Sequence, residues 1–66
     1  MNLETDLSKR ELQIIKLIAV GDGNQEISDK LGIARSTVKT HLRNIYTKTD
    51  HHDRANLAIS YLTKKL

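Results

Sequence analysis

The sequence predicts an all-α domain built from four short helices. Apolar residues recur at helical spacing in four separate segments, and glycine or other turn-forming residues separate those segments. Proline is absent from all 66 residues. The four helices are expected at about 9–20, 25–31, 35–48 and 54–64. A chain of this length has room for one small domain, residues 1–66, with a four-helix, bundle-like arrangement.

The composition limits the core and the compartment. Apolar residues make up 38% of the chain, with two tyrosines and no tryptophan or phenylalanine, so a modest aliphatic core of small stability is expected. The sequence has no apolar run near the ~20 residues of a membrane span and no signal peptide, so no membrane partner is expected. Cysteine is absent, which excludes disulfides and thiolate metal sites and fits a cytoplasmic protein.

The helix at 9–20 has clear start and stop signals. Ser8 can accept from the amide of Glu11, while the Glu11 side chain reaches back to the amide of Ser8, which is a capping box. Gly21 ends the helix. The polar segment 1–6 before it is expected to fray.

The next two helices, 25–31 and 35–48, are joined by a tight turn. Asn24 is expected to cap the first of them, and Gly32 to end it. A short helix, a glycine turn and a second helix form a helix-turn-helix, although a plain helical hairpin has the same pattern. Ala34 stands where a capping hydroxyl is usual, so the helix at 35–48 is expected to start without a good cap.

One side of the helix at 35–48 is polar and basic. Five basic residues occur from Lys30 to Thr49, counting Lys30 itself, and no acid stands between Asp29 and Asp50, in a chain of net charge +3. On a helical wheel the apolar residues share one stripe. The opposite side carries Ser36, Thr37, Lys39, Thr40, His41, Arg43, Asn44 and Thr47. Such a face fits a polyanion, namely nucleic acid, better than an ordinary solvated face, which usually mixes both signs of charge.

The segment Asp50-His51-His52-Asp53 breaks the pattern before the last helix, and Asp53 can cap that helix. The letters D-H-H also occur in a family of metal-dependent phosphoesterases. Those enzymes need further ligands on a large α/β scaffold, so an exposed turn is the better interpretation and no metal is expected. The chain has no glycine-rich phosphate loop and no nucleophile with an evident base, so neither enzymatic activity nor a cofactor is expected.

The helix at 54–64 is apolar over more than one narrow stripe. One part of it can close the core, and the remainder, with Leu66, could meet a second copy of the chain. A wide core-facing surface is the alternative. The residues expected at a homodimer interface are Leu57, Tyr61 and Leu62.

Taken together, these segments resemble the DNA-binding domain of LuxR/FixJ-type bacterial transcription regulators. In its length the chain is similar to the stand-alone, GerE-like members of that family. The resemblance covers residues 7 to about 62. The matching residues are Leu7-Ser8-Lys9-Arg10-Glu11 for L-T-x-R-E, Asn24-Gln25-Glu26-Ile27 for N-K-E-I, Ser36-Thr37-Val38-Lys39-Thr40-His41-Leu42 for x-T-V-K-x-H-L, then Asn44, Ile45, Lys48, and Arg54 at the start of the last helix.

The resemblance implies a four-helix fold whose third helix enters the DNA major groove. Base edges would be met by Lys39, Thr40 and Arg43. Phosphates would be met by Ser8, Asn24, Gln25, Thr37, His41 and Lys48, to which the basic and polar face of the helix adds Arg35, Ser36, Asn44 and Thr47.

Three departures from the family pattern stand out. Ala34 replaces the usual capping serine, and Gly32 stands where a larger residue is more common. Thr49-Asp50-His51 replaces L-G-V, which is expected to remove two apolar core residues and the glycine of a left-handed helix cap.

The sequence therefore predicts a sequence-specific, double-stranded DNA-binding transcription regulator that acts as a homodimer through its last helix. Two other hypotheses stay open. In one, the chain docks on another regulator or on RNA polymerase and uses its basic face for acidic side chains. In the other, it is a fragment similar to sigma-factor region 4.

Overall fold

The computed structural model describes residues 6–64, and this part of the chain is all-α, which confirms the predicted fold class. The expected fraying of residues 1–5 and the suggested contact of Leu66 lie outside the described residues. None of the described helices is long and apolar enough to cross a membrane. The helices are α1 (Lys9–Ala19), α2 (Asn24–Leu31), α3 (Arg35–Thr49) and α4 (Arg54–Leu62).

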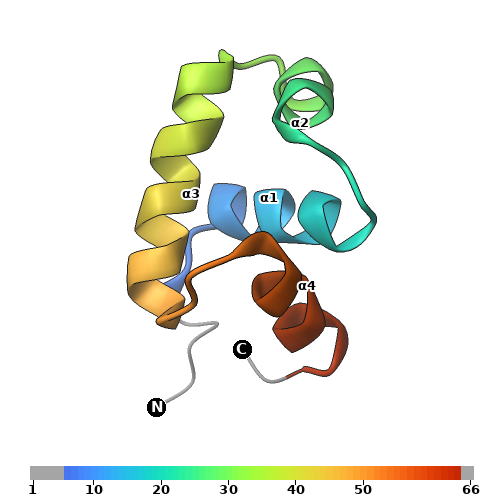
Figure 1. The fold of residues 1–66 in the computed structure, drawn as a ribbon. Helices are drawn as coiled ribbons and strands as arrows, with labels where there is room; N and C mark the ends of the chain where they lie inside the picture. Colours follow the sequence, from blue (N-terminus) through green and yellow to red (C-terminus); the bar gives the residue numbers. More distant parts are fainter. Residues whose placement is uncertain (1–5, 65–66) are drawn as a thin grey trace.

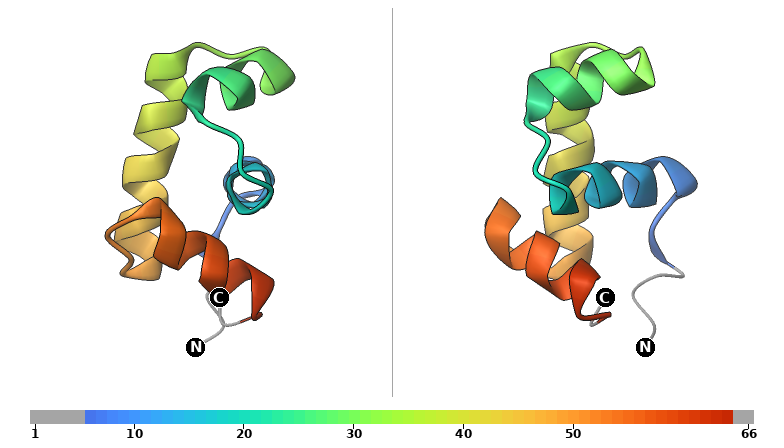
Figure 2. Two further views of the ribbon diagram at one scale, coloured as in Figure 1. Left: turned by 45° about the vertical axis from the view of Figure 1, so that its right-hand side comes forward. Right: turned by 90° about the vertical axis from the view of Figure 1, so that its right-hand side faces the viewer.

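Helix α1 runs through the middle of the molecule, with α2 on one side of it and α4 on the other (Figures 1 and 2). Helix α3 lies across the side of this stack. The main packing contacts are those of α1 with α4, α2 with α3, and α1 with α3. Helices α2 and α3 with their short turn form the helix-turn-helix. Helix α1 packs against α3, and α4 packs against α1.

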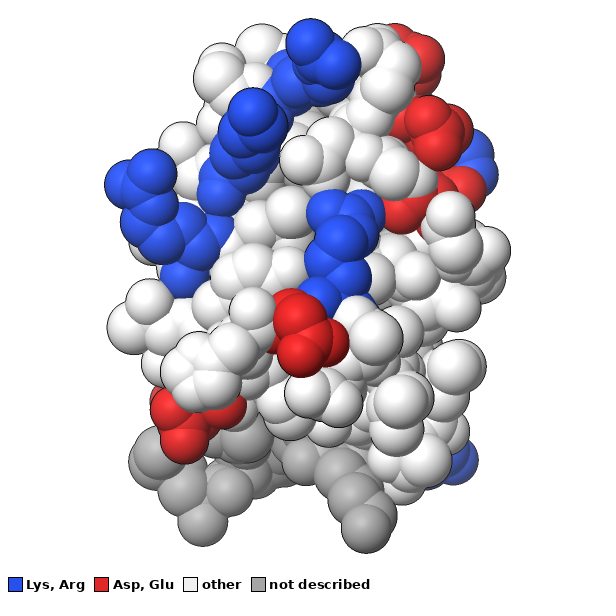
Figure 3. Space-filling model, in the orientation of Figure 1, with Lys and Arg blue, Asp and Glu red and all other residues white. Residues whose placement is uncertain are grey.

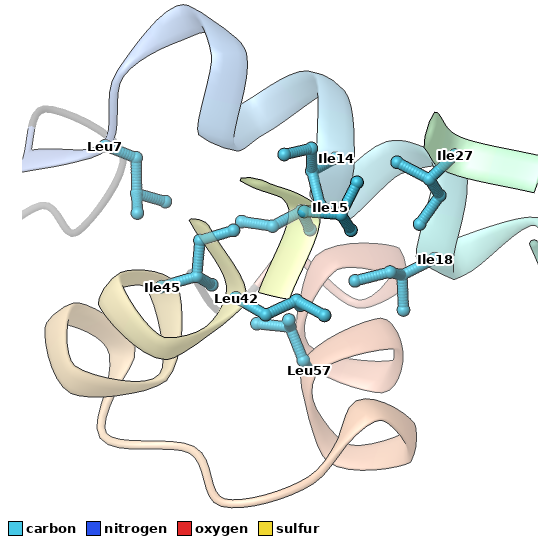
Figure 4. Packing of buried hydrophobic residues seen from close by; sticks show 9 residues of the cluster. Leu7, Ile14, Ile15, Ile18, Ile27, Leu42, Ile45 and Leu57 are labelled. Carbon is cyan, nitrogen blue, oxygen red and sulfur yellow. The ribbon is translucent and has the colours of Figure 1, made fainter. Parts of the chain in front are cut away.

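The core is small and aliphatic, as the composition predicts. Every helix contributes to it, and the side chains converge on the space between α1, α3 and α4 (Figure 4). Because α3 turns its buried stripe toward this space, its opposite side must face outward. The buried apolar residues are Leu7, Ile14, Ile15, Ile18, Ile27, Val38, Leu42, Ile45 and Leu57.

The position of Leu57 corrects one prediction. This residue was expected at a dimer interface, but its side chain is fully buried in the core of its own chain. Tyr61 is half-buried, whereas Leu62 is 63% exposed and Ile59 is 57% exposed. The outer apolar surface of α4 is therefore formed by Ile59 and Leu62, with Leu57 on the inner side.

The capping box of α1 is present. Ser8 Oγ accepts from the amide of Glu11 at 3.0 Å, and the amide of Ser8 donates to Glu11 Oε1 at 2.8 Å. The helix ends at Ala19, one residue before the expected end, and Gly21 follows with a positive φ of 97°. This turn needs a glycine because other residues rarely adopt that conformation.

Asn24 was expected to cap α2, but the cap position is occupied by Gly23. The amide of Gly23 donates to Glu26 Oε1 at 2.9 Å, so the glutamate closes the start of the helix from within. Asn24 is consequently the first residue of the helix, and its side chain makes a different contact, described below. Gly32 ends α2, as predicted, and the structure shows it in the left-handed conformation.

Both ends of α3 follow from the departures noted in the sequence. Ala34 precedes the helix in an extended conformation and offers no side-chain acceptor. At the other end, Asp50 takes the left-handed conformation that glycine usually fills, with φ 56° and ψ 30°. Thr49, which stands where the family pattern has an apolar residue, is buried on the inner stripe of α3, and its hydroxyl is satisfied by donating to the carbonyl of Ile45 at 2.8 Å.

Helix α4 starts as predicted. Asp53 Oδ1 accepts from the amide of Asn56 at 2.8 Å and caps its first turn. The helix ends at Leu62, two residues before the expected end, and Lys64 has a positive φ of 59°.

An ion pair ties the start of α1 to the end of α3. Lys48 Nζ donates to Glu11 Oε1 at 2.8 Å, and the Glu11 side chain is only 4% exposed while that of Lys48 is 40% exposed. Burial by itself raises the pKa of Glu11, but the hydrogen bonds from Lys48 and Ser8 and the charge of Lys48 outweigh it. The pKa of Glu11 therefore lies below its ordinary value of 4.5.

We expect Ala34→Ser to stabilise the free domain by about 0.5–2 kcal/mol, because a serine at this position can accept from a first-turn amide of α3. Urea unfolding at a fixed pH measures the difference. Ala55→Ser is the matched control: the same change inside α4, at an exposed position, should be neutral or slightly destabilising. An unchanged or lower midpoint for Ala34→Ser would show that residue 34 does not act as the cap.

We expect Glu11→Gln to lower the free energy of unfolding at neutral pH by about 1–2 kcal/mol. Because the folded-state pKa of Glu11 is depressed, this contribution is fully present above its ordinary pKa of 4.5 and is lost as the pH falls through the folded-state pKa. Wild type and variant should thus converge in acid when urea unfolding is repeated over a pH series. Glu26→Gln, at an exposed carboxylate outside any ion pair within residues 6–64, should show a smaller gap. A Glu11→Gln gap that stays constant with pH would contradict this account.

Candidate nucleic-acid interface

The outward side of α3 carries most of the predicted site. Val38, Leu42 and Ile45 anchor the helix inward, so residues between them point away from the core. His41 is half-buried at the edge of this surface. The exposed residues of this surface, which we call the α3 face, are Arg35, Ser36, Thr37, Lys39, Thr40, Arg43, Asn44 and Thr47.

The charge on the α3 face is positive and unbalanced. Arg35, Lys39 and Arg43 form no ion pair with any carboxylate of residues 6–64. Figure 3 shows basic side chains gathered over α3, whereas acidic side chains lie at the upper right, near the centre and at the lower left of the same view. Cations that are not neutralised by the protein's own carboxylates remain available to a polyanion.

Two threonines of the α3 face are held by their own helix. Thr40 Oγ1 donates to the carbonyl of Ser36 at 3.1 Å, and Thr47 Oγ1 donates to the carbonyl of Arg43 at 3.0 Å. These bonds use the hydroxyl hydrogen and fix the side-chain rotamer. What Thr40 can still offer to a base is therefore its oxygen lone pairs and its methyl group.

Ser8 and Lys48, 40 positions apart in the sequence, are brought to the same place by Glu11. One oxygen of Glu11 accepts both from the Ser8 amide at 2.8 Å and from Lys48 Nζ at 2.8 Å. An ammonium group has three donors, so Lys48 keeps two for another acceptor. The structure thus joins two predicted phosphate-contacting residues at the start of α1 and the end of α3.

Asn24 and Gln25 lie together in the first turn of α2. Gln25 Nε2 donates to Asp29 Oδ1 at 2.9 Å, so its amide group is held along the helix. Asn24 Oδ1 accepts from a guanidinium nitrogen of Arg54 at 2.6 Å. The first backbone amides of a helix have no acceptor within it, which makes such a turn suitable for an anion.

Two residues that shape the site were not recognised as part of it from the sequence. Glu11 was identified only as a helix cap, and Arg54 only as a family match. Their partners lie 37 and 30 positions away along the chain, Lys48 for Glu11 and Asn24 for Arg54. A local pattern holds no signal for contacts at that separation.

Tyr46 lies on α3 near the start of α4. Burial raises the pKa of its hydroxyl, and the positive charge of Arg54 opposes that rise. Among the described residues, no group of three or more His, Cys, Asp or Glu side chains is placed to hold a metal ion.

Comparison with known proteins identifies a family to which the chain is similar. The family described as "Bacterial regulatory proteins, luxR family" matches residues 5–61. The chain is 51% identical over 53 residues to the transcriptional regulatory protein LiaR of Bacillus subtilis, which covers 80% of this chain and 25% of LiaR. It is 47% identical over 60 residues to the oxygen regulatory protein NreC of Staphylococcus haemolyticus and of Staphylococcus aureus, which covers 91% of this chain and 28% of NreC.

The chain thus spans about a quarter of the length of these curated relatives. The family match, in contrast, takes in all four helices but the last residue of α4. The resemblance seen in the sequence motifs is confirmed, and this chain belongs to the luxR family of bacterial regulatory proteins.

Proposed function

We propose that this domain binds double-stranded DNA in a sequence-specific manner and regulates transcription, with α3 in the major groove. Membership of the luxR family supports DNA-binding transcription regulation. The observation that carries the more specific proposal is the α3 face, where three basic residues are exposed and make no ion pair within residues 6–64.

The dimensions of α3 suit the proposed docking. Its 15 residues make a rod of about 22 Å, and a B-DNA major groove about 12 Å wide admits one α-helix. Lys39 and Arg43 are one turn apart and carry donors that match the O6 and N7 acceptors of guanine. Thr40 lies beside them and can contact a thymine methyl group. These three residues are the proposed base-reading set.

The remaining polar residues are proposed to contact phosphates and so to fix the position of α3 in the groove. Backbone contacts of this kind orient a protein on DNA without reading its sequence. Members of this set lie at the starts of α1, α2 and α3, where unpaired amides favour anions. The proposed set is Ser8, Asn24, Gln25, Arg35, Ser36, Thr37, His41, Asn44, Thr47 and Lys48.

A homodimer through α4 is proposed for the DNA-bound state. Ile59 and Leu62 leave more than half of their area exposed, and Tyr61 is half-buried beside them. An apolar surface of this size on so small a domain supports a weak, symmetric contact that becomes firm on a two-fold operator. Leu57, which is buried, is no longer part of the proposed interface.

We expect Lys39→Ala and Arg43→Ala each to weaken binding to a selected operator by about 1–3 kcal/mol and to relax base preference at one position. Selection from a random duplex pool, followed by mobility shift, measures both effects. Lys16→Ala is the matched control, since it removes the same charge from an exposed site on α1. If both α3 variants keep the wild-type consensus and affinity, the base-reading role is wrong.

The two alternative functions give different results with the wild-type chain. DNA binding that needs polymerase subunits would favour a sigma-like role. Capture of another regulator without DNA binding would favour an interaction module.

We expect Leu62→Glu to reduce cooperative binding to paired half-sites while leaving binding to a single half-site close to wild type. The charge would be placed in the apolar contact between the two α4 helices, where it loses hydration without a partner. Val20→Glu is the control, because Val20 is 68% exposed at the end of α1. Circular dichroism establishes that both variants are folded. A folded Leu62→Glu protein with unchanged cooperativity would exclude this surface of α4 from the interface.

A further inference from the structure

Arg54 connects the start of α4 to the start of α2. One terminal nitrogen of its guanidinium donates to Asn24 Oδ1 at 2.6 Å, and the other donates to the backbone carbonyl of Asp22 at 2.8 Å. Arg54 is only partly exposed. The planar fork of a guanidinium suits such a double contact, because its two nitrogens reach two acceptors in a fixed geometry.

This contact decides which way the Asn24 amide faces. A side-chain amide has one acceptor end and one donor end. Arg54 can only donate, so the oxygen of Asn24 must turn toward it and the Nδ2 group must turn away. Nδ2 makes no hydrogen bond within residues 6–64. A phosphate can only accept from Nδ2, so the contact with Arg54 leaves Asn24 in the orientation that a phosphate requires.

The loop before α2 is held by the same contact. Arg54 donates to the backbone carbonyl of Asp22, and Lys30 Nζ donates to the Asp22 side chain at 2.7 Å. Glu26 Oε1 already occupies the amide of Gly23, but Gly23 has no side chain that could occupy the amides that follow it in the first turn. These amides and Asn24 Nδ2 therefore form one set of donors at a helix start, where the helix dipole also favours an anion.

We propose that Arg54 is a positioning residue for DNA binding: it fixes Asn24 and the start of α2 so that both donate to one phosphate. The inference rests on the proposed function of the domain. Arg54 would act through Asn24 and not by its own charge. It would also link α4, the proposed dimer helix, to the contact of α2 with the DNA backbone.

A double-mutant cycle in DNA affinity tests the proposal. We expect Asn24→Ala and Arg54→Lys each to weaken operator binding roughly three- to tenfold, the scale of one hydrogen bond. Lysine keeps the charge but cannot hold both acceptors. The double variant should bind about as well as the weaker single variant, because both changes remove the same contact. Affinities are measured by fluorescence anisotropy on the full chain at one salt concentration, below the unfolding range of every variant.

Asp53→Ala is the matched control. It removes the cap of α4 next to Arg54, so it should lower stability without touching Asn24. In a double variant, the fold-change in DNA affinity caused by Asp53→Ala should multiply with the fold-change caused by Asn24→Ala, because the two changes act independently. If Arg54→Lys binds like wild type, or if its effect also multiplies independently with that of Asn24→Ala, Arg54 does not position Asn24. Lys39→Ala distinguishes failure of this inference from failure of the proposed function. If Lys39→Ala weakens binding while Arg54→Lys acts independently of Asn24→Ala, only the positioning role of Arg54 is overturned. If neither Lys39→Ala nor Arg43→Ala has any effect, the proposed docking of α3 in the major groove is overturned.

Discussion

The packing of α1 against α3 and α4 is the interaction on which the rest of the structure depends. Ile14, Ile15 and Ile18 are all buried, and they meet residues of both neighbouring helices. Helix α2 is held mainly through α3, so it has no comparable support of its own. Burying one such side chain stabilises a protein by roughly 1.5–3 kcal/mol, which is a large share for a domain with nine buried apolar residues within positions 6–64. The outward direction of the α3 face is a consequence of this packing.

Polar contacts fix the orientation of the helix ends, which the small apolar core does not determine. Apolar packing is non-directional, so it holds the helices together without fixing how their ends are turned. The ends are fixed by hydrogen-bonded pairs between distant segments: Glu11 with Lys48 joins α1 to α3, and Arg54 with Asn24 joins α4 to α2. Both pairs involve a residue proposed to contact phosphate. In the proposed function, the same bonds would serve both stability and the orientation of the DNA-binding surface.

The sequence was informative wherever the deciding signal is local. The all-α class, the helix starts at Ser8 and Asp53, and the missing cap at Ala34 all depend on residues within one turn of each other. Leu57 was misplaced because α4 is apolar over so wide an arc that periodicity does not distinguish its inner from its outer side. Asn24 was taken for a cap because the alternative cap, Gly23, has no side chain to signal it.

The pairs that Glu11 and Arg54 form could not be predicted, since each joins segments 30 or more positions apart. Which residues read bases and which contact phosphates stays a prediction.

The pair between Lys48 and Glu11 has a consequence for ionic strength. Binding of a basic protein to DNA is strengthened at low salt because its positive charges displace cations condensed on the phosphates. A lysine whose charge is already balanced by a carboxylate of the same chain displaces fewer of them. Lys48 would then guide the domain on DNA by geometry more than by ion release. Binding would therefore weaken less steeply with rising salt than the number of basic residues around α3 suggests.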